Sequence, residues 1–286
     1  MINYNPKDWS TFIFHIDKSD TFRKLWPLML GVAVFSGLVA YAELNYFQLS
    51  KTSNVTNIGM MHSLLGFVLS LLLVFRTNTA YDRWWEGRKL LGSLTNVSRN
   101  LAIKIKALKL AEEDIRFFEY GIPKYAFALK EHLREKMYFG KNSLLIEVEE
   151  GKHIPNQIAG SLINRFYSLL EKGAISQEQF IVLSSDFNQF TDICGACERI
   201  KNTPIPFSYS AFIKKFIFVY VITLPFGWVF NLGYFVVPIV PFILYVLASL
   251  ELIAEEIENP FGYDANDLPV DQICNNIEKH VGEILG

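Results

Sequence analysis

The sequence predicts an all-α membrane protein with four transmembrane helices and a helical cytoplasmic domain. Of the 286 residues, 51% are hydrophobic and 15% are aromatic, which is high for a wholly soluble protein. Long apolar runs lie toward both ends of the chain, two on each side of a charged middle region. That middle region repeats apolar residues at helical spacing and has no Pro/Gly-rich linker.

The first two apolar runs are residues 26–44 and 58–75. The first carries a single charged residue over about the ~20 residues that a helix needs to cross a ~30 Å hydrocarbon core. The second is interrupted by His62, Ser63 and Ser70, which a helix that meets only lipid would seldom carry. We therefore expect one face of the second helix to contact protein or water.

The other two runs, residues 216–230 and 232–253, almost touch. Asn231 and Gly233 near the junction predict a tight turn, and thus a helical hairpin. Prolines within the runs predict kinks, which membrane helices tolerate where neighbours satisfy the freed carbonyl groups. These prolines are Pro225, Pro238 and Pro241.

Basic residues beside the runs predict the orientation, because Lys and Arg near the ends of spans are retained in the cytoplasm. They are Lys18, Arg23, Lys24, Arg76, Arg83, Arg88, Lys89, Lys214 and Lys215. We therefore expect a multi-pass protein of the cell membrane with both termini cytoplasmic. The predicted parts are an N-terminal cytoplasmic segment (1–25), transmembrane helices 1 and 2 (26–83), a helical cytoplasmic domain (84–210), transmembrane helices 3 and 4 (211–254) and a cytoplasmic tail (255–286).

Two further features concern the cytoplasmic part. Gly, Asn and Pro between Phe139 and Pro155 predict a break in the helical pattern. Apolar residues at four-, four- and three-residue steps predict an amphipathic helix at the C-terminus. These residues are Ile273, Ile277, Val281 and Ile284.

Charge and residue types argue against other function classes. The formal net charge is −2 and no Lys/Arg block occurs, so we expect no nucleic-acid partner. The five histidines are scattered, and no HExxH, GxSxG or phosphate-binding glycine loop occurs, so we expect no enzyme. Cys194 and Cys197 form a CxxC without a second Cys/His pair nearby, which favours reduced thiols in helix packing over a zinc or redox site.

Three stretches resemble the bestrophin family of ion channels. They are SLLGFVLSLLLVFRTNTAYDRWWEGR (63–88), CGACERIKNTPIPFSYS (194–210) and ENPFGYDANDLPVD (258–271). The resemblance implies a homopentamer in the lipid bilayer, with the second transmembrane helix of each subunit lining a narrow neck above a cytoplasmic vestibule. Members of the family mostly conduct anions, some bacterial members conduct cations, and the animal branch is activated by calcium.

The second helix carries the expected gate. Phe67, Leu71 and Phe75 recur every four residues and therefore share one face. By the resemblance this face is the pore neck, where five copies would form apolar rings that stop ions by dewetting. Ordinary helix packing is the alternative for the same spacing. The resemblance also implies a lower, cytoplasmic aperture at Ile175.

Ser70 and His62 are the candidate polar groups of the pore. Ser70 offers a hydroxyl, and His62 is charged when protonated, although a hydrogen-bonded interfacial role is the alternative for this histidine. The span has no acidic or basic ring, so the residues do not choose between anions and cations. We predict passive conduction of monovalent ions, with chloride first because most of the family conducts anions. The alternatives are a sodium or potassium channel of the same family and a non-conducting membrane scaffold.

The acidic turn after the fourth run is a candidate calcium site. Asn259, Asp264 and Asp267 offer oxygen ligands of the kind that calcium prefers. By the resemblance, the matching residues of the animal branch form a calcium clasp coupled to the neck. Departures from that pattern are Glu256, Ala265 and Asn266. The alternative is a turn that caps a helix and docks a subunit. We expect no required cofactor, with calcium as the only candidate.

Overall fold

The computed structural model describes residues 21–48, 58–135, 146–149 and 151–286. These residues form helices and no β-strand, which confirms the all-α class. They divide into two compact units, which are described separately. The described parts of residues 1–83, with 204–258 and 264–266, form the first unit, and the described parts of 84–203, with 259–263 and 267–286, form the second.

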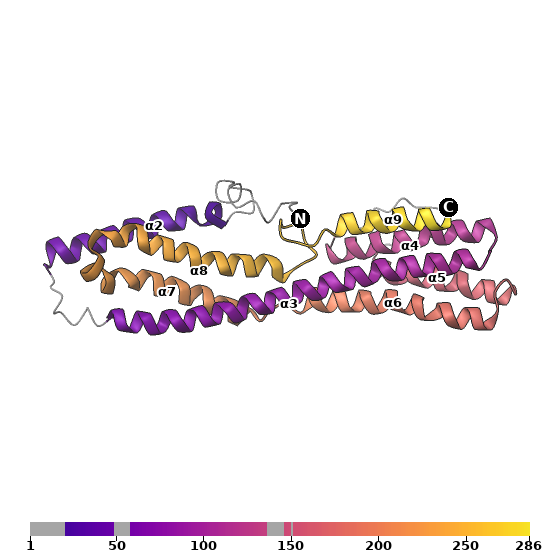
Figure 1. The fold of residues 1–286 in the computed structure, drawn as a ribbon, viewed down its shortest axis with the longest axis horizontal. Coiled ribbons are helices and arrows are strands. Elements are labelled where there is room, and N and C mark those ends of the chain that lie inside the picture. Colours follow the sequence, from indigo (N-terminus) through magenta and orange to yellow (C-terminus); the bar gives the residue numbers. More distant parts are fainter. Residues whose placement is uncertain (1–20, 49–57, 136–145, 150) are drawn as a thin grey trace. The chain divides into compact units, whose positions relative to one another are not determined.

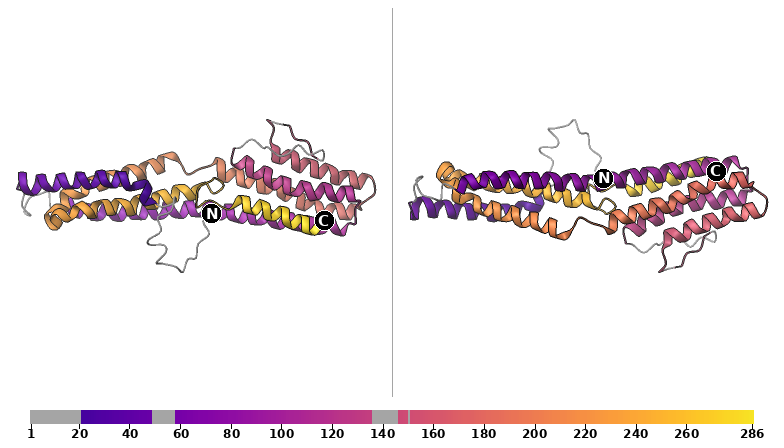
Figure 2. Two further views of the ribbon diagram at one scale, coloured as in Figure 1. Left: turned by 90° about the horizontal axis from the view of Figure 1, so that it is seen from above. Right: turned by 90° about the horizontal axis from the view of Figure 1, so that it is seen from below.

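The first unit is a bundle of long apolar helices. It contains α2 (Thr21–Tyr41) with the π-helical turn η1 (Ala42–Tyr46), α3 (Ile58–Ala107) as far as Arg83, α7 (Phe207–Leu232), the 3-10 turn η3 (Gly233–Phe235) and α8 (Val236–Glu258). In Figures 1 and 2, α2 and α7 both run alongside α8. Most of the buried side chains between the helices are apolar and form one hydrophobic cluster. They include Val32, Val39, Leu69, Leu73, Ile213, Ile217, Val221, Leu224, Val240 and Leu244.

Three ranges of the described chain are long and apolar enough to cross a membrane. They are Thr21–Tyr46, Gly59–Ala107 and Phe207–Glu258. The third range contains both α7 and α8, which form the predicted hairpin. The chain turns at Gly233, whose φ of +56° lies in the left-handed region that side chains with a Cβ seldom adopt. The N–H of Gly233 donates to Val229 O and closes the end of α7.

The second unit is a bundle of amphipathic helices. It contains the rest of α3, α4 (Glu112–Leu133), α5 (Ile154–Glu171), α6 (Gln177–Asn202) and α9 (Val270–Leu285). α4 lies between α5 and α9, and α5 packs against α6 (Figures 1 and 2). α9 is the predicted terminal helix, with Ile277 and Val281 fully buried. α4 ends before the predicted break and α5 begins within it, while residues 136–145 and 150 lie outside the described chain.

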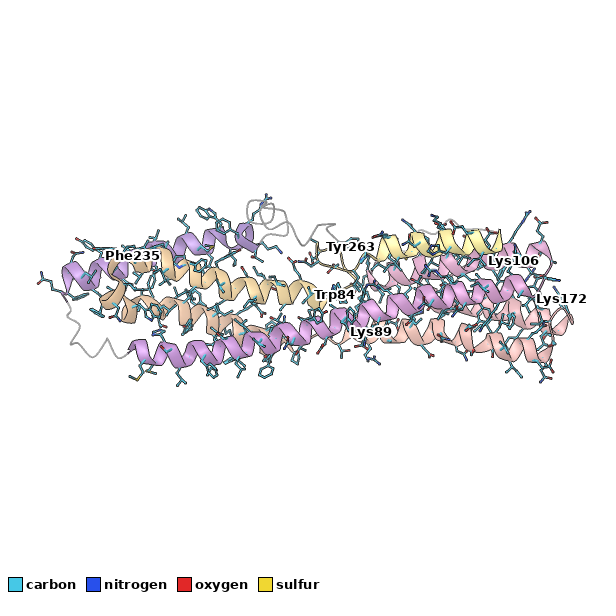
Figure 3. The ribbon with its side chains drawn as sticks, in the orientation of Figure 1. Trp84, Lys89, Lys106, Lys172, Phe235 and Tyr263 are labelled. Carbon is cyan, nitrogen blue, oxygen red and sulfur yellow. The ribbon has the colours of Figure 1, made fainter. Side chains whose placement is uncertain are left out.

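Polar contacts fix α3 to its neighbours in the second unit. Lys106 Nζ donates to Leu285 O at the C-terminal end of α9, 2.9 Å away (Figure 3). This bond satisfies a carbonyl that has no partner within its own helix.

The N-terminus of α6 is closed by a capping box between Ser176 and Gln179, which satisfies two backbone N–H groups reciprocally.

Candidate functional site: the uncovered face of α3 and its anchors

α3 has one covered and one uncovered face in the first unit. The covered face consists of His62, Leu69, Leu73, Arg76 and Ala80, each at most 3% exposed. The uncovered face includes the predicted neck residues, with Phe67 67%, Leu71 46% and Phe75 56% exposed. The described helices of the same chain therefore leave this apolar stripe open to lipid, water or another subunit.

α7 packs closely against the covered face of α3. A Cβ at Gly66 would lie 2.6 Å from Tyr220 Oη, so glycine lets α3 and α7 approach closely. Tyr209 Oη donates to Leu72 O at 3.3 Å. α7 thus holds the rear of α3 while the stripe stays uncovered.

The two candidate polar residues differ in position. His62 is buried, and its Nε2 lies 2.9 Å from Thr223 Oγ1 on α7. This is the hydrogen-bonded position that the sequence left as the alternative for His62. Ser70 is exposed and donates to Gly66 O at 2.8 Å. Its hydrogen is therefore engaged within the helix, and the oxygen lone pairs are its remaining polar capacity.

A buried arginine anchors α3 one residue beyond the stripe. Arg76 is 1% exposed, and its Nη2 lies 2.8 Å from Glu258 Oε2 while its Nε lies 3.3 Å from Glu251 Oε2. Glu258 Oε1 also accepts the Ile205 N–H at 2.6 Å, and Glu258 O accepts a hydrogen bond from Arg83 Nε at 3.0 Å. Glu258 thus joins α3, the end of α8 and the segment before α7. The sequence indicated Arg76 only as a marker of orientation.

Two more carboxylates lie near the C-terminal end of α8, where the helix dipole disfavours negative charge. Lys24 Nζ lies 2.5 Å from Glu256 Oε1, and Lys214 Nζ lies 2.9 Å from Glu255 Oε2. These cations offset the unfavourable charge. The basic residues that predicted the orientation therefore also bind α2 and α7 to α8.

The start of the acidic turn packs on α3 within the second unit. A Cβ at Gly87 would lie 3.1 Å from Pro260 Cγ, 3.2 Å from Phe261 Cζ and 3.3 Å from Leu268 Cδ1. Leu268 N–H donates to Pro260 O at 2.9 Å and closes the turn. Arg134 Nε donates to Phe261 O at 3.1 Å. Glycine at position 87 is thus what lets the turn lie against the helix.

The candidate calcium ligands occupy different environments. Asp267 is buried, and its Oδ2 would lie 2.8 Å from a Cβ at Gly262. In the same unit, Asn259 Nδ2 would lie 3.8 Å from that Cβ. Asp264 is exposed. The calcium site stays a prediction.

Ile175 lies in the turn between α5 and α6. Its side chain is 4% exposed and belongs to the core of the second unit. A side chain that lines an aperture has to reach the surface of its subunit. The aperture at Ile175 stays a prediction.

Comparison with known proteins decides the family. The family described as "Bacterial/Fungal Bestrophin protein" matches residues 1–283 of this chain. The chain belongs to the bestrophin family. Relatives of this chain include a voltage-dependent anion channel-forming protein of Nostoc sp., which is 36% identical over 231 residues, or 76% of this chain and 74% of that protein. Another of the same description, from Mesorhizobium japonicum, is 30% identical over 280 residues, or 96% of this chain and 89% of that protein.

Solved bestrophin structures share the fold. A bacterial bestrophin homologue from Klebsiella pneumoniae, carrying one substitution, aligns with a TM-score of 0.82 at 27% identity. The alignment covers 92% of this chain and 100% of that chain. This chain is therefore a membrane protein of a family of ion channels.

Proposed function

We propose that this chain is the pore-forming subunit of a homopentameric channel that passively conducts monovalent ions across the cell membrane, with chloride first. The observation that carries the proposal is the apolar stripe of Phe67, Leu71 and Phe75, which the described helices of the same chain leave uncovered. The relatives from Nostoc and Mesorhizobium are named as anion channel-forming proteins, which supports an anion as the conducted ion.

The stripe fits a hydrophobic gate. Phe67 and Phe75 are eight residues apart on one helix, so three rings of side chains would extend over about 12 Å of the pore axis. An ion that enters such a neck loses hydration without receiving polar groups in exchange. A small change in the width of the neck would therefore switch it between a hydrated state that conducts ions and a dewetted state that blocks them.

A monovalent-cation channel is the second candidate, and the geometry of Ser70 favours it. Its hydroxyl hydrogen is engaged by Gly66 O, so the oxygen presents lone pairs, which attract cations. An anion would require this hydroxyl to break its bond within the helix. Arg76, a basic residue one position beyond the stripe, is buried against Glu251 and Glu258 and offers an anion no free charge.

The reversal potential of purified protein in a planar bilayer under a tenfold KCl gradient tests the choice. A perfectly selective channel reverses about 59 mV from zero, at the chloride potential for an anion channel and at the potassium potential for a cation channel. Repeating the measurement with micromolar calcium tests the acidic turn. No current from protein shown to be pentameric would contradict the channel and support a membrane scaffold.

Two variants test the gate. Leu71→Ala and Phe75→Ala should each widen the neck and raise single-channel conductance or open probability. Leu38→Ala is the matched control, because Leu38 is an exposed leucine of α2, outside the stripe. Unchanged current in correctly assembled Leu71→Ala and Phe75→Ala proteins would contradict the gate, as would an equal increase in Leu38→Ala.

A further inference from the structure

Three side chains from separate helices meet at one point of the second unit. His132 lies in the last turn of α4, His153 is the N-cap of α5, and Glu198 lies on α6. Nε2 of each histidine lies 2.6 Å from Glu198 Oε1, and the two ring centroids are 4.4 Å apart. All three side chains are partly exposed, so an ion from solution can reach them.

We propose that His132, His153 and Glu198 bind a divalent transition-metal ion, with zinc as the first candidate. Their ligand atoms lie within 4.8 Å of one another. Two imidazoles and one carboxylate form a zinc-ligand set that leaves a fourth position for water. Calcium and magnesium prefer sites made of oxygen ligands, so the two imidazoles select against them.

The electrostatics favour a cation at this point. Glu198 supplies a carboxylate, and both imidazoles already contact its Oε1. Lys201 lies close by, because its Nζ is 3.4 Å from His132 O. Its positive charge, which opposes a bound cation, is paired with Glu135 at 2.9 Å.

Binding requires a small rearrangement. Ligand atoms around a tetrahedral zinc ion lie about 3.3 Å apart, as bonds of about 2.0–2.1 Å dictate. The present contacts of 2.6 Å are hydrogen bonds, so the Glu198 carboxylate has to withdraw by less than about 1 Å to admit the ion. Rotation of its partly exposed side chain would supply this movement.

The cap of α5 makes this binding weaker than that of a closed site. His153 Nδ1 accepts the Asn156 N–H at 3.2 Å, so in the neutral ring the proton resides on Nε2. An ion bound at Nε2 moves that proton to Nδ1, and Asn156 N–H then loses its partner. We therefore expect weaker binding than in a structural zinc site with four protein ligands. The bound ion would cross-link α4, α5 and α6.

The test is metal binding by the full-length pentamer in detergent, without a polyhistidine tag and after removal of chelator. Equilibrium dialysis with Zn²⁺ measures affinity, and the visible absorption of Co²⁺ reports a four-coordinate site. His153→Asn is the informative variant, because asparagine is a good N-cap and removes the imidazole ligand. His132→Gln removes the second imidazole. His280→Gln is the matched control, since His280 contacts Arg99 in the same unit but lies outside the cluster.

We expect one ion per subunit, with affinity lowered at least tenfold in His153→Asn and in His132→Gln and unchanged in His280→Gln. The Co²⁺ absorption should disappear in both cluster variants. Wild-type binding no tighter than that of either cluster variant, with each protein eluting as the intact oligomer, would overturn the proposal. An equal loss in His280→Gln would overturn it too. If one of the two cluster variants does not assemble, the metal affinity of the other variant decides whether the proposal holds. The readout is binding, so it stands apart from ion conduction.

Discussion

Replacing Arg76 by methionine should be among the most destabilising single changes in the first unit. Methionine has a similar length but no charge, so it would leave Glu251 and Glu258 without their shared cation. The side chains are 1% exposed for Arg76, 3% for Glu251 and 13% for Glu258, so water cannot replace the arginine. Removing one partner from a buried ion pair costs about 3–5 kcal/mol, mainly because the remaining charge stays buried.

The control is Arg116→Met. Arg116 pairs with Glu112 on the surface of α4, and both side chains are well exposed. Such pairs are worth roughly 0.3–0.5 kcal/mol, so this variant should unfold close to the wild type. Arg76→Lys should fall between the two, because one ammonium keeps the charge but loses the planar fork that reaches both carboxylates.

Thermal unfolding of the purified protein, followed by tryptophan fluorescence, measures these differences. A chain of this size loses roughly 2–4 °C of Tm per kcal/mol, so Arg76→Met should lower the midpoint by on the order of 10 °C. A midpoint for Arg76→Met within about 1 °C of that for Arg116→Met would refute the reasoning. The arginine would then not be held in a buried ion pair.

Two further predictions concern the second unit. A Cβ at Gly121 would lie 2.6 Å from Leu162 Cδ2, whereas a Cβ at Gly160 has no atom within 4 Å. Both positions gain helix propensity on change to alanine, so the steric contact at position 121 decides the difference between the two variants. Gly121→Ala should be less stable than Gly160→Ala by about 1–3 kcal/mol. Equal midpoints in thermal unfolding would contradict the close packing. Burial raises the pKa of the three thiols to about 12. They are Cys194, Cys197 and Cys274. At pH 8 these thiols should react with a thiolate-specific reagent only after unfolding, and rapid labelling of the native protein would show that they are accessible.

The apolar runs predicted the helices of the first unit well. A run of about 20 apolar residues has few stable conformations in lipid other than a helix, because each backbone polar group must be satisfied within the segment. Turn residues placed the hairpin near Gly233, and the helical spacing of apolar residues placed the terminal helix around Ile277. The four-residue spacing of Phe67, Leu71 and Phe75 put them on one face.

The hydrophobic pattern of the sequence could not predict the polar contacts between helices. Arg76 read as one of several basic residues at a span end, although an arginine so close to an apolar run was a signal of a buried partner. Its partners lie 175 and 182 positions away, at Glu251 and Glu258. His132 and His153 seemed scattered for the same reason, since Glu198 is 66 and 45 positions from them.

The sequence by itself determined which segments are helical, which of them suit a membrane, and which face of α3 is apolar. These are local properties, because hydrophobicity and spacing act over a few turns of one helix. Tertiary structure alone decided which charges are buried together, which face of α3 the chain leaves uncovered, and that two histidines share a carboxylate. Side chains far apart along the chain become neighbours only when the helices pack, and no local pattern records that proximity.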